Sequence, residues 1–342
     1  MTLQREKTVL KFRMTYFTRR ASFRGRAFIM SNVFLISLNA IVPICIIMGI
    51  GYLMRRCGAL EEETVLKMNS VVFRIFLPLM LFQSIRKSDL SATVNPKLFI
   101  FTIASVTILI ICSIIFTLLT VKDRKKQSVV MMGLFRSNYA IVGLSVAQAL
   151  AGDQGAATVA VLLAFTTPVY NAVSIIILEM FGGQKTGIKQ LFADILKNPL
   201  IIACVSGIVF SALKLELPGM LEKVATDMAN VATPLALFLL GAFFKFSGLR
   251  EGLRELIMIT LGRLVIVPAI FLTASYLMGF RGAEFVAILC LFAASAAVSS
   301  FTMAAELGGD QNLAGNVVIV TSCLFSFTLY CWSVLFKLLG AW

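Results

Sequence analysis

Two apolar stretches of this chain contain the polar side chains that could do chemistry. The first holds Arg136-Ser137-Asn138-Tyr139, followed by Gly143 and Ser145. The second lies 157 residues further on and holds Ser295, Ser299, Ser300 and Thr302. Polar groups surrounded by hydrocarbon are unfavourable unless they face a cavity or a partner helix. Both stretches are therefore candidate sites.

The residue types in these stretches suit an anion. A Gly-bearing, Ser-rich stretch loosens a helix, and an unwound turn there directs free backbone N–H groups and a half-helix N-terminus at a negative group such as a carboxylate. The alternative is that small residues only allow close helix packing and that Asn138 bridges two helices. The predicted binding residues are Asn138, Ser137, Gly143, Ser145, Asn171, Ser295, Ser299 and Ser300.

Three further residues have two interpretations each. Asn171, close behind Pro168, could coordinate a ligand or hydrogen-bond to the carbonyl that the proline leaves free. Arg263 and Arg136 are candidate charge partners for an anion. The distance of Arg263 from the start of its apolar stretch favours instead a side chain that reaches back to the membrane interface, and Arg74 is expected to be an interfacial anchor too.

The residues that are missing narrow the chemistry. The chain has no histidine, and its seven cysteines form no paired spacing, so neither a metal centre nor a cofactor is expected. No Asp or Glu lies near the middle of an apolar stretch, so a cation held by paired buried carboxylates is excluded, although coupling to H⁺ or Na⁺ is left open. No intramembrane protease motif is present. The ligand is expected to be anionic and the protein not to be an enzyme.

Composition shows what must position these residues. Apolar residues make up 59% of the 342 and the mean hydropathy is +0.92, more than a soluble core could bury. Runs near twenty residues predict membrane-spanning helices in a lipid bilayer, not barrel strands. The ten predicted spans are Val33 to Met54, Leu66 to Ile85, Leu98 to Thr120, Ser128 to Ala151, Ala156 to Met180, Pro199 to Leu217, Leu221 to Phe244, Leu256 to Gly279, Glu284 to Glu306 and Leu313 to Leu339.

The chain is an internal duplication. Gly152-Asp153-Gln154 recurs as Gly309-Asp310-Gln311, and Leu134-Phe135 recurs as Leu291-Phe292, at one offset of 157 residues. Five spans per half is an odd number, so the second half is inverted in the membrane. The fold class is thus an all-α integral membrane protein with a first repeat over 31–181 and a second over 198–342. Spans four and nine are expected to cross, interrupted, near the midplane.

Basic residues indicate the orientation. The odd-numbered loops hold 13 Lys and Arg and the others 7, which places the odd loops in the cytoplasm and both termini outside a cell membrane. Residues 1–30 conflict with this, because they add eight basic residues and one acid. They are either an arm for anionic lipid or targeting, or an extension upstream of a start at Met30, and we favour the second. The net charge of +14 owes half its size to this arm, so no nucleic-acid partner is expected.

The order of these features resembles the auxin efflux carrier family, in particular its bacterial members described as malate or malonate permeases. The resemblance runs from about Met30 to the C-terminus. The matching pieces are Ile41-Val42-Pro43 with Gly49-Ile50-Gly51-Tyr52, Phe76-Leu77-Pro78, Ser137-Asn138 with Gly143, Pro168-Val169-Tyr170-Asn171 and Asn198-Pro199.

The resemblance implies a scaffold (33–86 and 198–246) and a moving transport domain (98–181 and 256–340). It also implies elevator-type carriage of a small mono- or dicarboxylate, malate-like, malonate-like or auxin-like, with a homodimer as an option. Family members usually carry a proline at each crossing, whereas this chain has none there and has Ser145 where the first is expected. Helix breakage is then expected to depend on Gly143 and the serines. The alternative is a transport-inactive sensor or interaction protein that retains the fold.

Overall fold

The computed structural model describes residues 38, 41–87, 95–182, 188–245, 248 and 252–342. The predicted basic arm 1–30 and the start of the first predicted span lie outside these residues. Within them the chain is helical, apart from turns, short extended segments and one isolated β-bridge between Ser137 and Ala296.

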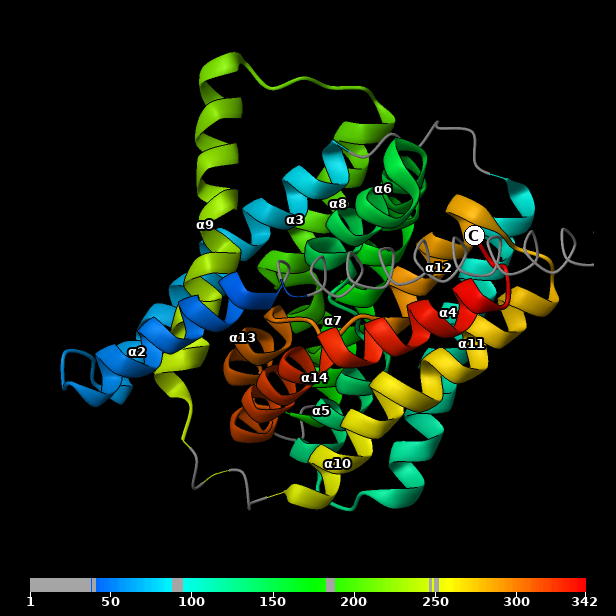
Figure 1. The fold of residues 1–342 in the computed structure, drawn as a ribbon. Coiled ribbons are helices and arrows are strands. Elements are labelled where there is room, and N and C mark those ends of the chain that lie inside the picture. The colour runs from blue at the N-terminus through cyan, green and yellow to red at the C-terminus, as the bar shows by residue number, and fades with distance from the viewer. Residues whose placement is uncertain (1–37, 39–40, 88–94, 183–187, 246–247, 249–251) are drawn as a thin grey trace, which may run out of the picture.

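The helices follow one another with short connections (Figure 1). They are a helix at 41–56, α2 (Glu62–Val71), the π-helical turn η1 (Val72–Phe76), α3 (Leu77–Arg86), α4 (Pro96–Thr120), α5 (Arg124–Phe135), α6 (Tyr139–Phe181), α7 (Ile188–Lys197), α8 (Pro199–Ala212), α9 (Gly219–Phe243), α10 (Leu253–Leu261), the π-helical turn η3 (Gly262–Ile266), α11 (Val267–Leu277), α12 (Gly282–Ala293), α13 (Ser299–Glu306) and α14 (Gln311–Leu338).

Six helical stretches among the described residues are long and apolar enough to cross a bilayer, namely Glu62–Arg86, Pro96–Thr120, Val142–Phe181, Gly219–Phe243, Leu253–Leu277 and Gln311–Leu338. α8 and α12 are apolar but shorter. The chain is therefore a multi-pass helical membrane protein.

Local sequence explains where several of these helices begin. Asn95 and Asn198 each accept a hydrogen bond from a backbone N–H two residues on, and each precedes a proline at the first helical position. Asp123 caps α5 and Asp310 caps α14 in the same way. These caps satisfy N–H groups that a helix start leaves free.

The repeated Gly-Asp-Gln tripeptide marks a turn between helices in each half. Gly152 has φ of 64°, which divides α6 into two helices, and Gly308 has φ of 79° in the turn between α13 and α14. Glycine adopts such positive φ values without the steric cost that a Cβ brings. The two glycines do not occupy matching positions of the repeat, because Gly152 is the first residue of its tripeptide and Gly308 precedes the second tripeptide by one residue.

One side of the molecule is built from α2, α3, α8 and α9 (Figure 1). The helix at 41–56 lies directly against α9. A Cβ on Gly51 would overlap the carbonyl oxygen of Phe238, and one on Gly241 would overlap that of Met48. The two backbones therefore touch, as they do where small residues meet in membrane helices.

A polar link joins this side to the rest of the molecule. Arg74 in η1 pairs with Glu306 at the end of α13 at 3.1 Å, and the hydroxyl of Ser70 donates to the same carboxylate. Asn69 donates to the backbone carbonyl of Thr302. That Arg74 is an interfacial anchor stays a prediction, and its side chain in addition contacts another helix.

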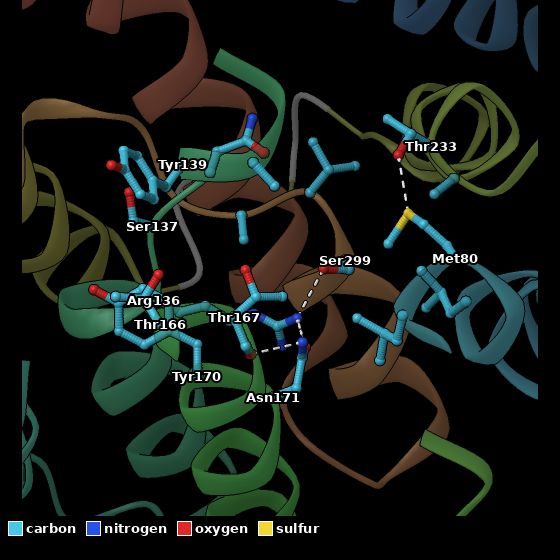
Figure 2. Close-up of a pocket in the computed structure, with 17 residues that line it drawn as sticks. Met80, Arg136, Ser137, Tyr139, Thr166, Thr167, Tyr170, Asn171, Thr233 and Ser299 are labelled. Carbon is cyan, nitrogen blue, oxygen red and sulfur yellow. Dashed lines mark hydrogen bonds between the residues drawn. The ribbon is translucent and has the colours of Figure 1, made fainter. Parts of the chain in front are cut away.

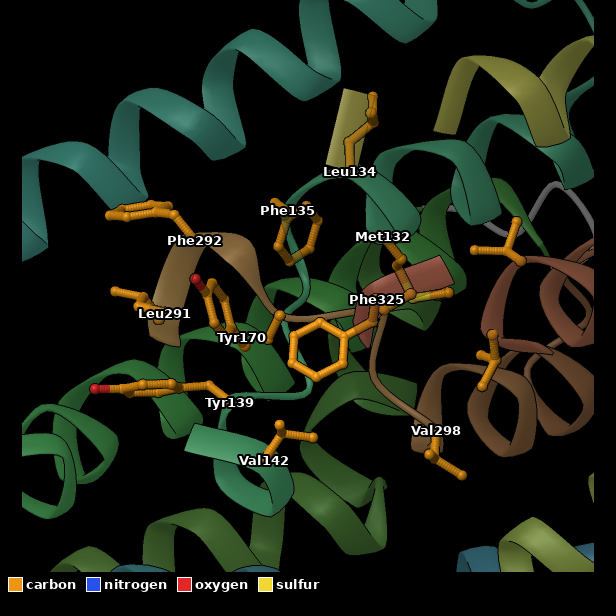
Figure 3. Packing of buried hydrophobic residues seen from close by; sticks show 14 of the residues in the cluster. Met132, Leu134, Phe135, Tyr139, Val142, Tyr170, Leu291, Phe292, Val298 and Phe325 are labelled. Atoms are coloured by element: carbon orange, nitrogen blue, oxygen red, sulfur yellow. The ribbon is translucent and has the colours of Figure 1, made fainter. Parts of the chain in front are cut away.

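The most buried helices are the two that end at the centre of the molecule. Every residue of α5 from Gln127 to Phe135 is buried, as is every residue of α12 from Phe285 to Ala293. Figure 3 shows the side chains packed around their ends, including Phe135 against the ring of Tyr170 at 5.9 Å between centroids. The chain beyond each of these two ends is not helical.

Candidate functional site

Two helices are interrupted and cross each other at these ends. α5 ends at Phe135 and α6 begins at Tyr139, while α12 ends at Ala293 and α13 begins at Ser299. The short segments between them, 136–138 and 294–298, are here called the crossing segments. They run antiparallel: the backbone N–H of Asn138 donates to Ser295 at 2.9 Å, and that of Ala297 donates to Arg136 at 3.3 Å.

The interruptions include Ser137 and Ser295, two of the predicted serines, but not Gly143 or Ser145. Helix α6 continues through Gly143, whose missing Cβ would overlap the ring of Tyr139, and Ser145 is exposed on the same helix. Pairing between the crossing segments replaces hydrogen bonds that each helix loses, so neither a proline nor a glycine is needed to break it. The predicted roles of Gly143 and Ser145 at the break are therefore wrong.

The cavity beside the crossing has a volume of about 90 Å³ (Figure 2). Both crossing segments, the α6 helix and the opposite helices α3 and α9 line it. The lining residues are Leu77, Met80, Leu81, Arg136, Ser137, Asn138, Tyr139, Ala140, Thr166, Thr167, Tyr170, Asn171, Thr233, Ala236, Ala297, Val298 and Ser299. Since one water needs roughly 10 to 15 Å³ of such space, the cavity holds several water-sized groups.

Arg136 brings a buried positive charge to this cavity. Its side chain is 4% exposed, and one nitrogen, Nη2, donates to Asn171 Oδ1 at 2.6 Å and to Ser299 Oγ at 2.9 Å (Figure 2). Nη1 contacts the sulfur of Met303. None of the ion pairs formed by the described residues includes Arg136. A buried cation surrounded by neutral partners is unfavourable and attracts an anion.

Asn138 adds an unused donor. Its side chain is 3% exposed, and its Nδ2 has no hydrogen-bond partner in the described part of the chain. The hydroxyls of Tyr139 and Tyr170 are in the same state. Buried polar groups without partners are rare in folded proteins and call for an explanation such as an absent ligand.

Helix ends give the cavity the same sign of charge. α6 and α13 both begin at its lining, at Tyr139 and Ser299, and the N-terminus of a helix carries free N–H groups and a partial positive charge. Together with Arg136 they make the cavity electropositive. Its geometry suits a small anion with several acceptor oxygens.

Arg263 is not among the residues that line the cavity. It is fully buried, and its guanidinium donates to backbone carbonyls of Leu134 and Leu291, near the ends of α5 and α12. The prediction that it reaches the membrane interface is wrong, because the side chain is fully buried and donates to these carbonyls inside the molecule. It is also no direct charge partner for a ligand in the cavity.

The remaining predicted residues divide into two groups. Ser137, Asn171 and Ser299 line the cavity with Asn138 and Arg136, although the Ser137 hydroxyl donates to Leu291. The side-chain amide of Asn171 donates to the carbonyl of Thr167. It does not donate to the carbonyl of Ala164, which is left free because Pro168 has no N–H. Ser295 and Ser300 are buried near the crossing but do not line the cavity.

Several lining residues were not predicted. Tyr170 stands within the Pro168-Val169-Tyr170-Asn171 motif, which could have indicated it. Met80 and Thr233 come from α3 and α9, and nothing in their local sequence places them opposite the crossing. Their contact, Thr233 Oγ1 to the sulfur of Met80, is a property of the packed structure alone.

A helical membrane protein with two interrupted helices that cross beside a cavity lined by a buried arginine has the architecture of a secondary transporter. The chain belongs to the membrane transport protein family, which matches residues 36–192 and 187–333; this is the auxin efflux carrier family that the sequence resembles.

Three relatives extend over most of the chain. An uncharacterized transporter of Methanothermobacter thermautotrophicus is 25% identical over 308 residues, covering 87% of this chain and 95% of that protein. An uncharacterized transporter of Methanocaldococcus jannaschii is 21% identical, covering 87% and 98%. A Rhizobium meliloti protein whose name ascribes malonate transport to it is 22% identical over 294 residues, covering 83% and 91%.

Proposed function

We propose that this chain is a secondary transporter that carries a small organic anion across the cell membrane and binds it at the crossing. The observation that carries the proposal is the buried Arg136 guanidinium, which lines the cavity with no carboxylate partner among the described residues. A bound carboxylate would neutralise it and accept hydrogen bonds from Asn138 Nδ2 and Arg136.

Cavity size and chemistry favour a short mono- or dicarboxylate of the malonate or malate type. A volume of about 90 Å³ holds several water-sized groups, whereas an auxin-like ring acid would need the cavity to widen. The cavity wall opposite Arg136 includes Met80 and Ala236, which suit the carbon chain of an organic acid better than an inorganic ion. The malonate transport ascribed to a relative agrees with this class.

The proposed architecture is a 5+5 inverted repeat of ten spans. The first five are the helix at 41–56, α2 with α3, α4, α5 with the start of α6, and the rest of α6; the second five are α8, α9, α10 with α11, α12 with α13, and α14. Interruptions in the fourth and ninth members of this series support the arrangement.

We further propose that α4, α5, α6 and α10 to α14 move as one transport domain against the helix at 41–56, α2, α3, α8 and α9. The cavity supports this division, because both sides contribute to its lining. Movement of one side would open the cavity to one membrane face and then the other. The odd-numbered loops are proposed to face the cytoplasm, from their excess of basic residues.

Uptake of labelled malonate and malate into proteoliposomes tests the proposal, with a carboxylate panel screened in parallel for thermal stabilisation. A ligand at 100 times its dissociation constant should add roughly 2.7 kcal/mol to the free energy of unfolding. No uptake and a flat panel would favour the transport-inactive sensor. The sensor was suggested by the missing crossing prolines, but both helices are interrupted without them, so that observation no longer favours it.

A further inference from the structure

Arg263 binds the ends of both interrupted helices at once. Its Nε donates to Ala294 at 2.9 Å, Nη2 to Leu291 at 3.0 Å, and Nη1 to Leu134 at 3.3 Å and Phe135 at 3.5 Å. All four acceptors are backbone carbonyls. Every nitrogen of the guanidinium is thus used, and none of these bonds goes to an acid.

Backbone carbonyls at a helix end inside a membrane protein need hydrogen-bond donors. The last four carbonyls of a helix lack internal partners, and the C-terminus carries a partial negative charge. Here two such ends, those of α5 and α12, meet in the buried centre of the molecule. Arginine alone among the side chains offers five N–H donors in a rigid fork, so one residue can serve both ends.

The π-helical turn η3 is what brings the guanidinium there. Gly262 opens this turn, and a Cβ on it would overlap the side chain of Leu134 near the end of α5. The absence of a side chain at Gly262 lets η3 approach the crossing closely. The residue at the matching position of the first half, 157 residues earlier, is Val106, so this device exists only once.

We propose that Arg263 is the positioning residue of the crossing: by joining the ends of α5 and α12 it fixes the crossing segments that place Arg136 and Asn138 in the cavity. Its acceptors differ from the carbonyls of Ser295 and Arg136, which accept the bonds that pair the crossing segments. Arg263 does not touch the ligand. The inference rests on the proposed function only where ligand affinity is the readout.

The alternative is that Arg263 supplies only a positive charge to the two helix ends. Lysine distinguishes these roles, because it keeps the charge but donates from a single nitrogen and cannot span both ends. Arg281→Lys is the matched control. Arg281 also donates to carbonyls, those of Tyr276 and Phe280, but these lie at the end of one helix only.

The experiment measures hydrogen exchange of peptides spanning the crossing segments in the full chain without ligand, and malonate affinity by calorimetry. Arg263→Lys should speed exchange at both crossing segments and weaken malonate binding roughly tenfold or more, since small misplacements of a site are costly. Arg281→Lys should do neither. If Arg263→Lys shows the exchange rates and the malonate affinity of the wild type, the proposal is overturned. Arg263 would then supply only a positive charge to the two helix ends.

A second variant guards against misfolding of the first. Gly262→Ala keeps the arginine but pushes η3 away from Leu134, and it should speed exchange at the same peptides by a smaller factor. If Arg263→Lys does not fold, unchanged exchange of the crossing-segment peptides in Gly262→Ala would also overturn the proposal. Exchange needs no ligand, so the role of Arg263 is decided even if the wild type binds neither malonate nor any other acid of the carboxylate panel, a result that would refute the proposed function.

Discussion

Replacement of Asn138 by alanine separates ligand binding from helix packing. Its Nδ2 has no partner among the described residues, and the bond from Asn138 to Ser295 uses the backbone, which alanine retains. The substitution should therefore change stability little. A bound carboxylate would lose one charge-assisted hydrogen bond of about 1.5 to 3 kcal/mol. This corresponds to a dissociation constant roughly ten to a hundred times larger.

Calorimetric titration of malonate into purified wild type and Asn138→Ala measures this change, with thermal unfolding of each protein recorded in parallel. Asn316→Ala is the matched control, because it removes the same amide from a buried asparagine. That amide donates to the carbonyl of Gly248 at 3.1 Å and does not line the cavity. The control should lower stability by about 1 kcal/mol and leave the dissociation constant unchanged.

Two results would refute this reasoning. Wild-type affinity in Asn138→Ala would move the binding site away from the crossing. A loss of stability on the order of 0.6 kcal/mol with unchanged affinity would mean that the Asn138 side chain bridges helices. Ser295→Ala gives a further check: its side chain does not line the cavity, so affinity should change less than in Asn138→Ala.

Four other outcomes are expected. Arg136→Gln should weaken malonate binding by about 2 kcal/mol or more, measured by the same titration; wild-type affinity would exclude a charge role. Gly51→Ala should lower the unfolding temperature because its Cβ meets backbone, whereas Gly49→Ala, with open space around it, should be neutral or stabilising by up to about 1 kcal/mol. Glu306→Gln should speed hydrogen exchange in α13, an effect of about 1 kcal/mol or less because the Arg74 partner of the ion pair is 70% exposed; unchanged exchange would mean that this ion pair does not stabilise α13. A cysteine introduced beside Lys125 should resist impermeant reagents added outside intact cells, and labelling would reverse the proposed orientation.

Much of the fold could be predicted because its signals are local. Apolar runs, the Asn198-Pro199 pair and the repeated Gly152 tripeptide each depend on a few neighbouring residues. They gave the class of protein, the start of the helix after Asn198 and the internal duplication. The family membership suggested by the order of the motifs is confirmed by the match over both halves.

The sequence predicted which region forms the site but not the hydrogen bonds that hold it together. Asn138, Ser137 and Arg136 were singled out as polar residues in apolar sequence, and they line the cavity. The part of the helix break assigned to Gly143 was wrong, because the bonds that allow the break come from a segment far away in sequence. Arg263 was misjudged for the same reason: its acceptors include Leu134, 129 residues away. The position of Arg263 along its own predicted span does not reveal partners on other helices.

The unpaired charge of Arg136 has an electrical consequence for the proposed transport cycle. An empty site carries one positive charge, and a bound monocarboxylate brings the site close to zero. The membrane potential then acts mainly on the step in which the empty site returns. That step would feel up to about 2.3 kcal/mol per 100 mV for one charge that crosses the whole membrane field. A dicarboxylate would leave the loaded site negative, so the voltage dependence of the transport current would report the charge of the cargo.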